Sequence, residues 1–269
     1  MRYKDADDFM QKNGYTMNGG WYPRVTKILE VKSKPGLDSF FKEVGSYDFA
    51  EAIKNKSAEE GTLVHETMQK LACGQPILIP EQIRPAAETF MNFIAEKNIV
   101  FHPEFVEKKV WSNFHKYAGT VDALASFGGK FGVLDIKTST GFYPDYNLQT
   151  AAYVAALREE ETKKALSLPR EIETRWILRV DQCQICQRCG ASLRLKGGRH
   201  KVRIRNGGAS HQDPLCLPLG HDWGEVKGVI EMREFPEIAG DWKAFQAAKV
   251  LWDWENDYWL KQIGYVGNV

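Results

Sequence analysis

Two strand-like segments joined by a Gly-Gly pair constrain the fold of this chain more than any other feature. Residues 117–127 and 130–138 are rich in β-branched, aromatic and small apolar residues, and Gly128-Gly129 between them suits a two-residue hairpin turn. Such a turn pairs Phe127 with Lys130. Because side chains alternate between the two faces of a strand, this register determines on which face each side chain of the hairpin lies.

The register brings acidic and basic side chains together. It places Asp122 opposite Asp135, with Cβ atoms about 5 Å apart, and Lys137 on the same face as Asp135. Opposed carboxylates repel each other unless a cation lies between them, and Mg²⁺ prefers a few carboxylates while it keeps several waters. The alternative interpretation is a solvated Asp122 beside a surface Asp135–Lys137 ion pair. We expect a catalytic site for Mg²⁺ or Mn²⁺.

The remaining segments predict an α/β fold. Residues 1–60 are expected to be mostly helical after a short extended piece, and a helix is expected to open after Gly61. Helices are expected over 61–72, 81–98, 144–166 and 241–260. Strands are expected over 105–113, 173–181 and 225–235. Aromatic residues at helical spacing near the C-terminus indicate a stripe that faces the core: Trp242, Phe245, Trp252 and Trp259.

Four short motifs occur in order along the chain: GTLVH (61–65), GTVD (119–122), DIKTS (135–139) and QTAAY (149–153). Each alone is weak. In this order they resemble the GxxxH, GxxD, DxK and QxxxY motifs of RecB-like nucleases in the PD-(D/E)XK superfamily. YPRVTKIL (22–29) and KPGLDSFF (34–41) also resemble phage exonucleases and the mitochondrial genome maintenance exonuclease. The resemblance implies a restriction-endonuclease-like core, which is a central mixed β-sheet flanked by helices, with a helical N-terminal part.

The resemblance also implies a role for each motif residue. The implied ligands of the catalytic metal are His65, Asp122, Asp135 and the carbonyl group of Ile136. Lys137 would be the catalytic lysine. Gln149 and Tyr153, which share a helical face because they are four residues apart, would steer DNA or support the site. Glu107 matches an acidic position upstream of GxxD and would bind the metal or its water indirectly; an ordinary surface position is the alternative.

The cysteines indicate a second metal. There are five, and an odd, clustered number without a secretion signal argues against disulfides. CQRCG (186–190) and a later Cys/His pair have the spacing of a zinc ribbon. The expected Zn²⁺ ligands are Cys186, Cys189, Cys216 and His221, with Cys183 as an alternate and His200 and His211 in reserve.

An iron–sulfur cluster is the competing interpretation. RecB-like nucleases of the CRISPR adaptation type hold a 4Fe-4S cluster with four cysteines. The matching residues here would be Cys73, Cys183, Cys186 and Cys189. However, Cys73 follows the GxxxH motif instead of preceding it, and Cys216 and His221 would have no role. Zinc is therefore favoured.

The cysteine-containing segment is also basic. From Cys183 to His221, seven basic residues oppose only Asp213, so the segment carries +6; the whole chain carries +1, which leaves −5 elsewhere. A basic module on an acidic body indicates a localised contact with a polyanion. The expected DNA-binding residues are Arg194, Lys196, Arg199, Lys201, Arg203 and Arg205. The expected division is a nuclease domain over 1–182 and 223–269 and an inserted zinc-ribbon-like module over 183–222.

Together these features predict a metal-dependent deoxyribonuclease. It would act as an exonuclease on single- or double-stranded DNA in recombination, repair or replication, as in phages. Because the sequence shows no signal peptide and no apolar run long enough to span a bilayer, we expect the cytoplasm of a bacterium or of a phage-infected host, and no membrane partner. The alternatives are a non-catalytic zinc-containing nucleic-acid-binding protein and a structural protein with paired carboxylates. No feature indicates an oligomeric state.

Overall fold

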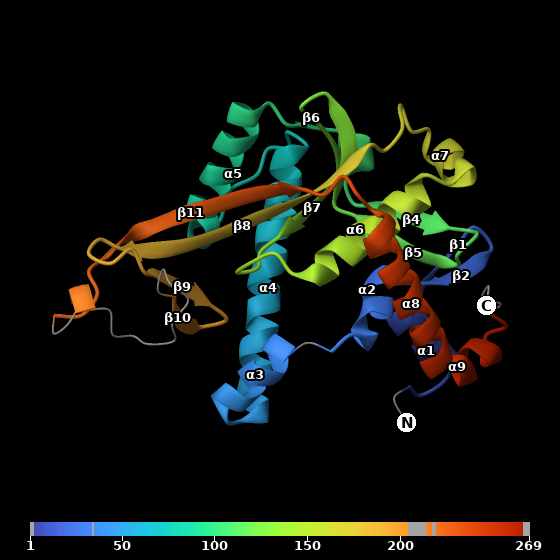
Figure 1. Cartoon of the computed structure of the whole chain (residues 1–269), viewed down its shortest axis with the longest axis horizontal. Coiled ribbons are helices and arrows are strands. Elements are labelled where there is room, and N and C mark those ends of the chain that lie inside the picture. Colours follow the sequence, from blue (N-terminus) through green and yellow to red (C-terminus); the bar gives the residue numbers. More distant parts are fainter. Residues whose placement is uncertain (1–2, 34, 204–213, 217–218, 266–269) are drawn as a thin grey trace.

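A seven-stranded mixed β-sheet lies at the centre of the structure (Figure 1). The computed structural model describes residues 3–33, 35–203, 214–216 and 219–265. The strands of this sheet are β3 (Val100–Phe101), β6 (Ala123–Phe127), β7 (Lys130–Lys137), β8 (Thr174–Cys186), β9 (Ser192–Lys196), β10 (Arg199–Arg203) and β11 (Trp223–Glu234). Their order is β10-β9-β8-β7-β6-β3, and β11 pairs with β8. The predicted α/β class with a central mixed sheet is confirmed.

The long strand β8 organises the sheet. Its first half pairs in parallel with β7, its second half pairs with β9 at Gln184 and Ile185, and β11 runs antiparallel along most of its length. Because a strand has only two edges and β11 occupies one of them, β7 and β9 lie end to end along the other. The chain that leaves β7 therefore meets the β9–β10 hairpin.

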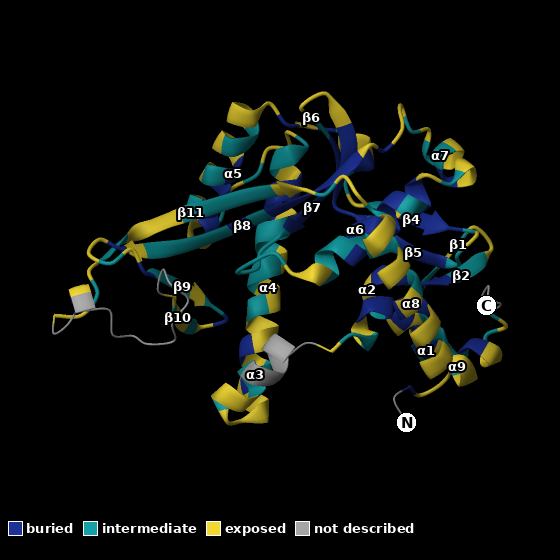
Figure 2. Cartoon of the chain, viewed as in Figure 1, coloured by how far each residue is buried: buried dark blue, intermediate teal, exposed yellow. Residues whose placement is uncertain are grey.

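Helices cover both faces of the inner sheet (Figure 1). They are α4 (Tyr47–Ala72) and α5 (Arg84–Lys97) on one face, and α6 (Pro144–Leu157) and α8 (Ala239–Glu255) on the other. Alternate residues of β7 enter two cores: Phe131 and Val133 pack with α6, whereas Leu134 and Ile136 pack with α4 and α5. Asp135 therefore faces α6. Buried residues concentrate in the inner sheet, whereas β11 and the outer half of β8 are more exposed (Figure 2).

Smaller elements complete the fold. The N-terminal part holds α1 (Ala6–Asn13), β1 (Gly14–Met17), β2 (Gly20–Pro23), α2 (Val25–Ile28) and α3 (Pro35–Val44). Strand β2 lies at the start of the short extended piece that the sequence predicts, whereas β1 and its pairing with β2 were not predicted. A second small sheet pairs β4 (Lys108–Ser112) with β5 (Tyr117–Val121), and α7 (Glu160–Leu166) and α9 (Asp257–Gln262) follow α6 and α8.

Several predicted elements have different bounds. The helix predicted over 61–72 is the end of α4, which begins at Tyr47, where the side chain of Ser46 caps it by accepting from the N–H of Phe49. The helices predicted over 144–166 and 241–260 are each interrupted, giving α6–α7 and α8–α9. The strands predicted over 173–181 and 225–235 are longer or shifted, as β8 and β11.

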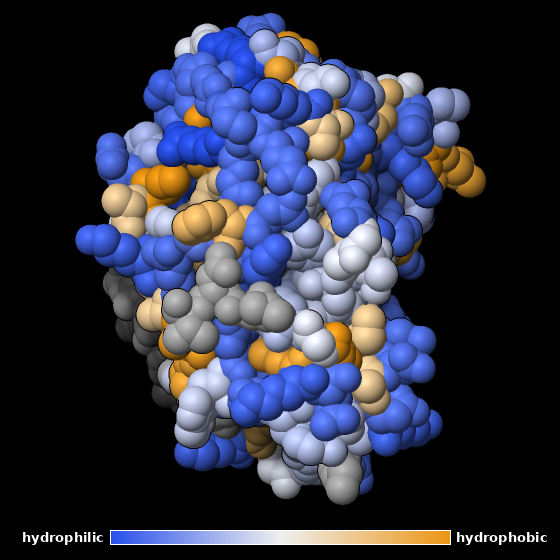
Figure 3. All heavy atoms as spheres, turned by 90° about the vertical axis from the view of Figure 1, so that its right-hand side faces the viewer, coloured by the Kyte–Doolittle hydropathy of each residue, from blue (hydrophilic) through white to orange (hydrophobic). Residues whose placement is uncertain are grey.

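The aromatic stripe of the C-terminal helices faces the core as predicted. Phe245 and Trp252 are buried, and Trp242 and Trp259 pack against the same core. The surface on this side of the molecule is largely hydrophilic, with scattered hydrophobic residues (Figure 3).

Candidate active site and candidate metal centre

The hairpin that carries the DxK motif has the predicted turn but not the predicted pairing throughout. Phe127 pairs with Lys130, and the register holds along β6. At Asp122, however, the chain bends, and Tyr117–Val121 leave to form β5 in the second sheet. The predicted cross-strand pair of Asp122 and Asp135 is therefore wrong. The two carboxylates remain close enough for their charges to interact.

The bend turns the Asp122 carboxylate toward two donors. Oδ2 of Asp122 accepts from the backbone N–H of Ile136 at 2.7 Å and lies 2.9 Å from Nε2 of His65 on α4. Burial raises the pKa of Asp122, but the His65 hydrogen bond and the charge of Lys137 outweigh it, so the net shift is downward. For His65, burial lowers the pKa, and the Asp122 contact more than offsets this. The contact between His65 and Asp122, together with the hydrogen bond from Ile136 to Asp122, thus joins α4 to the end of β7.

Asp135, on β7, belongs to the same site and is fully buried. Its Oδ2 atom is 2.8 Å from Nζ of Lys137 but has no partner in hydrogen-bonding geometry. Burial raises the pKa of Asp135 to about 7, with Asp122 adding to the rise and Lys137 opposing it. Buried carboxylate oxygens without a full set of hydrogen bonds are unfavourable. This environment suits a bound cation.

Glu107, whose position the sequence left open, lies at the site. His65, Glu107 and Asp122 can each offer one ligand atom, and these atoms lie within 4.8 Å of one another. The Glu107 side chain accepts a hydrogen bond from Gln69. Gln69 was missed in the sequence, although it lies one helical turn after His65 on the same face of α4.

Helix α6 supplies the predicted supporting pair. Nε2 of Gln149 donates to the hydroxyl group of Tyr153 at 3.0 Å and lies 3.4 Å from Oδ1 of Asp135. The ammonium group of Lys137 lies 5.1 Å from the ring centroid of Tyr146, a second residue that sequence reasoning missed. The first turns of α6, the helix that follows the DxK strand, thus lie against the Asp135–Lys137 pair.

Gly61 allows α4 to approach the end of β7. A Cβ atom at this position would lie 2.9 Å from Oγ1 of Thr138, the residue after Lys137. The sequence predicts that a helix opens after Gly61, but Gly61 lies in the middle of α4. The close approach of α4 to β7 brings His65, one turn later, within reach of Asp122.

Gly119→Ala should test how tightly the GxxD strand packs on this pair. A Cβ atom at Gly119 would lie 2.4 Å from Cε1 of the buried Tyr153 ring, so the ring or the strand must move. We expect a loss of about 1–3 kcal/mol in the free energy of unfolding, seen as a lower Tm. Gly240→Ala on α8 is the control because nothing lies within 4 Å of its Cβ position. Equal Tm values for the two variants would contradict the packing argument.

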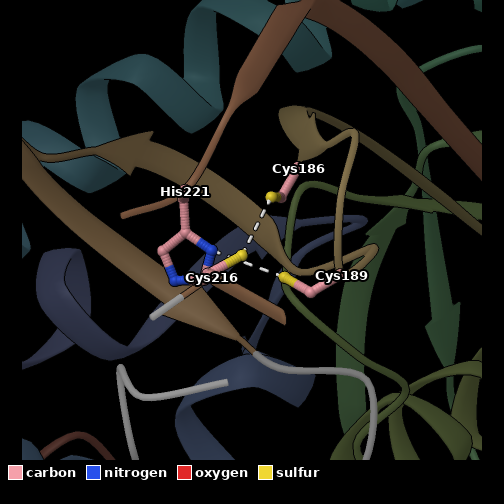
Figure 4. Close-up of side chains that lie close together, drawn as sticks. All are labelled: Cys186, Cys189, Cys216 and His221. Carbon is pink, nitrogen blue, oxygen red and sulfur yellow. Dashed lines mark hydrogen bonds between the residues drawn. The ribbon is translucent and has the colours of Figure 1, made fainter. Parts of the chain in front are cut away.

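The four predicted zinc ligands gather at the far end of β8 (Figure 4). Cys186, Cys189, Cys216 and His221 offer ligand atoms within 4.8 Å of one another. Sγ of Cys186 lies 3.6 Å from Sγ of Cys216, and Sγ of Cys189 lies 3.4 Å from Nδ1 of His221. Burial raises the pKa of Cys216, and the neighbouring thiols Cys189 and Cys186 raise it further, to about 12. Three thiols and one imidazole nitrogen within this distance of one another are a donor set that fits Zn²⁺.

The other candidate ligands lie outside this group. Cys183, Cys73 and His200 are described by the structure but are not part of the four-residue group. His211 lies outside the described residues. The four cysteines that an iron–sulfur cluster would need are therefore not the ones that the fold gathers.

The basic residues of the β9–β10 hairpin partly contact the protein itself. Arg194 and Lys196 both donate to the carbonyl oxygen of Thr138, at 2.8 Å and 2.6 Å. Arg199 pairs with Glu43, and Arg203 donates to Thr140. Arg205 lies outside the described residues. The hairpin is thus held against the loop that follows β7, and DNA contact by these residues stays a prediction.

Part of this chain is similar to a known exonuclease. The relative is mitochondrial genome maintenance exonuclease 1 of Mus musculus, which is 28% identical over 156 residues. The match covers 51% of this chain and 45% of the mouse protein, so the chain matches just under half the length of that relative. No family model matches the chain. Among the described residues, no helix is long and apolar enough to cross a membrane.

Proposed function

We propose that this protein is a metal-dependent deoxyribonuclease of the PD-(D/E)XK type that acts as an exonuclease. The observation that carries the proposal is the convergence of three elements on one site: His65 from α4, Asp122 from the bend before β6, and Asp135 with Lys137 from β7. The similarity to a protein named as an exonuclease supports the same function class.

The proposed ligands of Mg²⁺ or Mn²⁺ are His65, Asp122, Asp135 and the Ile136 carbonyl group, with Glu107 beside them. An ion there would polarise the phosphodiester bond and make water a stronger nucleophile. Lys137 would orient the attacking water or neutralise charge that grows on the phosphate. Gln149 positions Asp135, because it links that carboxylate to the buried Tyr153.

The second proposed metal is a structural Zn²⁺ held by the Cys186–Cys189–Cys216–His221 group. It would stabilise a module over 183–222 that is too small to build a large core, inserted in a nuclease domain over 1–182 and 223–269. DNA is the proposed partner, contacted in part by the basic β9–β10 hairpin, and the cytoplasm is the proposed location.

Cleavage of end-labelled DNA tests this function directly. Single- and double-stranded DNA, and RNA as a comparison, are incubated with the protein and Mg²⁺ or Mn²⁺. We expect DNA cleavage that stops when EDTA is in excess and resumes when Mg²⁺ is restored. Mononucleotides or short products from the first time points would identify exonuclease action. Binding of DNA without cleavage would instead support a zinc-containing binding protein.

A further inference from the structure

A pocket of about 470 Å³ lies between α4, the β9–β10 hairpin and the loop that follows β7. Five of its twelve lining residues are cationic and five carry hydroxyl groups, whereas none is acidic. The cationic residues are Lys54, Arg194, Lys196, Arg199 and Lys201. Thr138 also lines the pocket and directly follows Lys137, so the pocket adjoins the proposed active site.

Two of these cations are held in place by hydrogen bonds and still have unused hydrogen-bond donors. Arg194 donates to Asp181 and to the Thr138 carbonyl oxygen, and Lys196 donates to the carbonyl and hydroxyl oxygens of Thr138. A guanidinium group has five N–H donors and an ammonium group has three, so both residues keep unused donors. Burial, and then the charge of Arg194, lower the pKa of Lys196 to about 8. Arg194 and Arg199 are paired with acids that lie outside the lining, Asp181 and Glu43, whereas the lining itself contains no acid. The positive charge that remains favours an anionic ligand.

Two further cations are uncommitted. Lys54 on α4 and Lys201 on β10 are exposed, and neither has an ion-pair or hydrogen-bond partner within the described part of the chain. They come from elements far apart in sequence, which the fold brings to the two sides of one pocket. Two aromatic residues, Phe40 and Tyr143, also line it, and the side chain of Tyr143 is 47% exposed.

We propose that this pocket binds a nucleotide unit of the nucleic-acid strand whose neighbouring phosphodiester lies in the active site. Its cations and hydroxyl groups would bind the backbone phosphates that flank this nucleotide, and its aromatic rings offer faces for a base. The inference rests on the proposed nuclease function and extends the DNA contact beyond the β9–β10 hairpin, to Lys54 and Ser57 on α4 and to the Thr138–Thr140 loop.

Binding measurements with a paired variant test the pocket. A fluorescein-labelled single-stranded oligonucleotide is titrated with the Asp135→Asn protein, with and without Lys54→Gln and Lys201→Gln together, at several salt concentrations. We expect the added pair to weaken binding about tenfold at low salt and to reduce the slope of log K against log salt by about 1.4, which is about 0.7 for each lost phosphate contact. The matched control is Lys164→Gln with Lys243→Gln, on α7 and α8, away from α4 and the β9–β10 hairpin (Figure 1).

Cleavage by the same pairs separates the two proposals. In the otherwise unchanged protein, we expect Lys54→Gln with Lys201→Gln to raise KM about tenfold and to leave kcat within about twofold, as for loss of uniform binding. If the protein cleaves DNA and both pairs behave alike in KM and salt slope, the pocket inference is wrong and the nuclease function stands. If no cleavage occurs but the pocket pair alone weakens binding, the pocket stands and the nuclease function fails.

Discussion

Asp135→Asn and Lys137→Met are each expected to lower the rate of DNA cleavage by about a thousandfold or more. Asp135 is the fully buried carboxylate of the site, and its Oδ2 atom has no partner in hydrogen-bonding geometry. Asparagine keeps the shape but removes the charge that would bind a divalent ion. Lys137 carries the amine nearest to that carboxylate, at 2.8 Å, and methionine keeps most of its volume without the charge. The measurement is kcat/KM on end-labelled DNA with Mg²⁺.

Each variant also breaks a partly buried ion pair, which by itself costs stability. Asp253→Asn and Lys249→Met are therefore the matched controls, because they break the Lys249–Asp253 pair of α8 at a site that the proposed chemistry does not use. We expect the controls to keep cleavage within about threefold of the unmodified protein. Full activity of Asp135→Asn or Lys137→Met, or an equal loss in the controls, would refute the site assignment.

Cys216→Ser is expected to release the second metal and to disorder the segment that carries the β9–β10 hairpin. Structural zinc sites of this kind contribute about 10–16 kcal/mol of apparent binding free energy to folding. The hairpin contacts Thr138, directly after Lys137, so its loss should also lower cleavage, by about tenfold or more at low salt, where phosphate contacts count most. The measurements are metal content by elemental analysis, Tm and kcat/KM. We expect one zinc per chain in the unmodified protein and none in the variant.

Substitution of the other cysteines distinguishes zinc from an iron–sulfur cluster. Cys183→Ser and Cys73→Ser should leave metal content and Tm nearly unchanged, because neither residue belongs to the four-residue group. An iron–sulfur cluster would give the opposite pattern, with iron and acid-labile sulfide in the protein and loss of both in these two variants. That result would overturn the zinc proposal.

Local signals in the sequence located much of the candidate site. The Gly128-Gly129 turn predicts the β6–β7 register, and the order of the four motifs predicts that α6 follows the DxK strand. Gln69 and Tyr146 were missed because a glutamine or a tyrosine on a helix has many structural uses. Their proximity to Glu107 and Lys137 depends on contacts across the fold.

The bend at Asp122 shows where local reasoning stops. Alternation along 117–127 predicts one strand, but the chain leaves the sheet at Asp122 because Tyr117–Val121 pair with β4 instead. Which strand a segment pairs with depends on long-range contacts, namely which sheet edge is free and which core the side chains fill. Period-2 alternation is the same whether residues 117–121 pair with β4 or continue in the central sheet, so it does not predict the partner.

By itself, the sequence determined the identities and the order of the chemical groups: which residues form the β6–β7 turn, which acids and amine flank it, and which cysteines have the spacing of metal ligands. Only the tertiary structure decided which groups meet. β8 carries β7 on the first half of one edge and β9 on the second half, so the exit of the DxK strand contacts the basic hairpin. That contact helps to form the pocket beside the active site, which Lys54 on α4 and Lys201 on β10 both line. The physical reason is that two segments that pair with the same strand edge come together even when they are distant in sequence. Local patterns of side chains do not predict which segments share an edge.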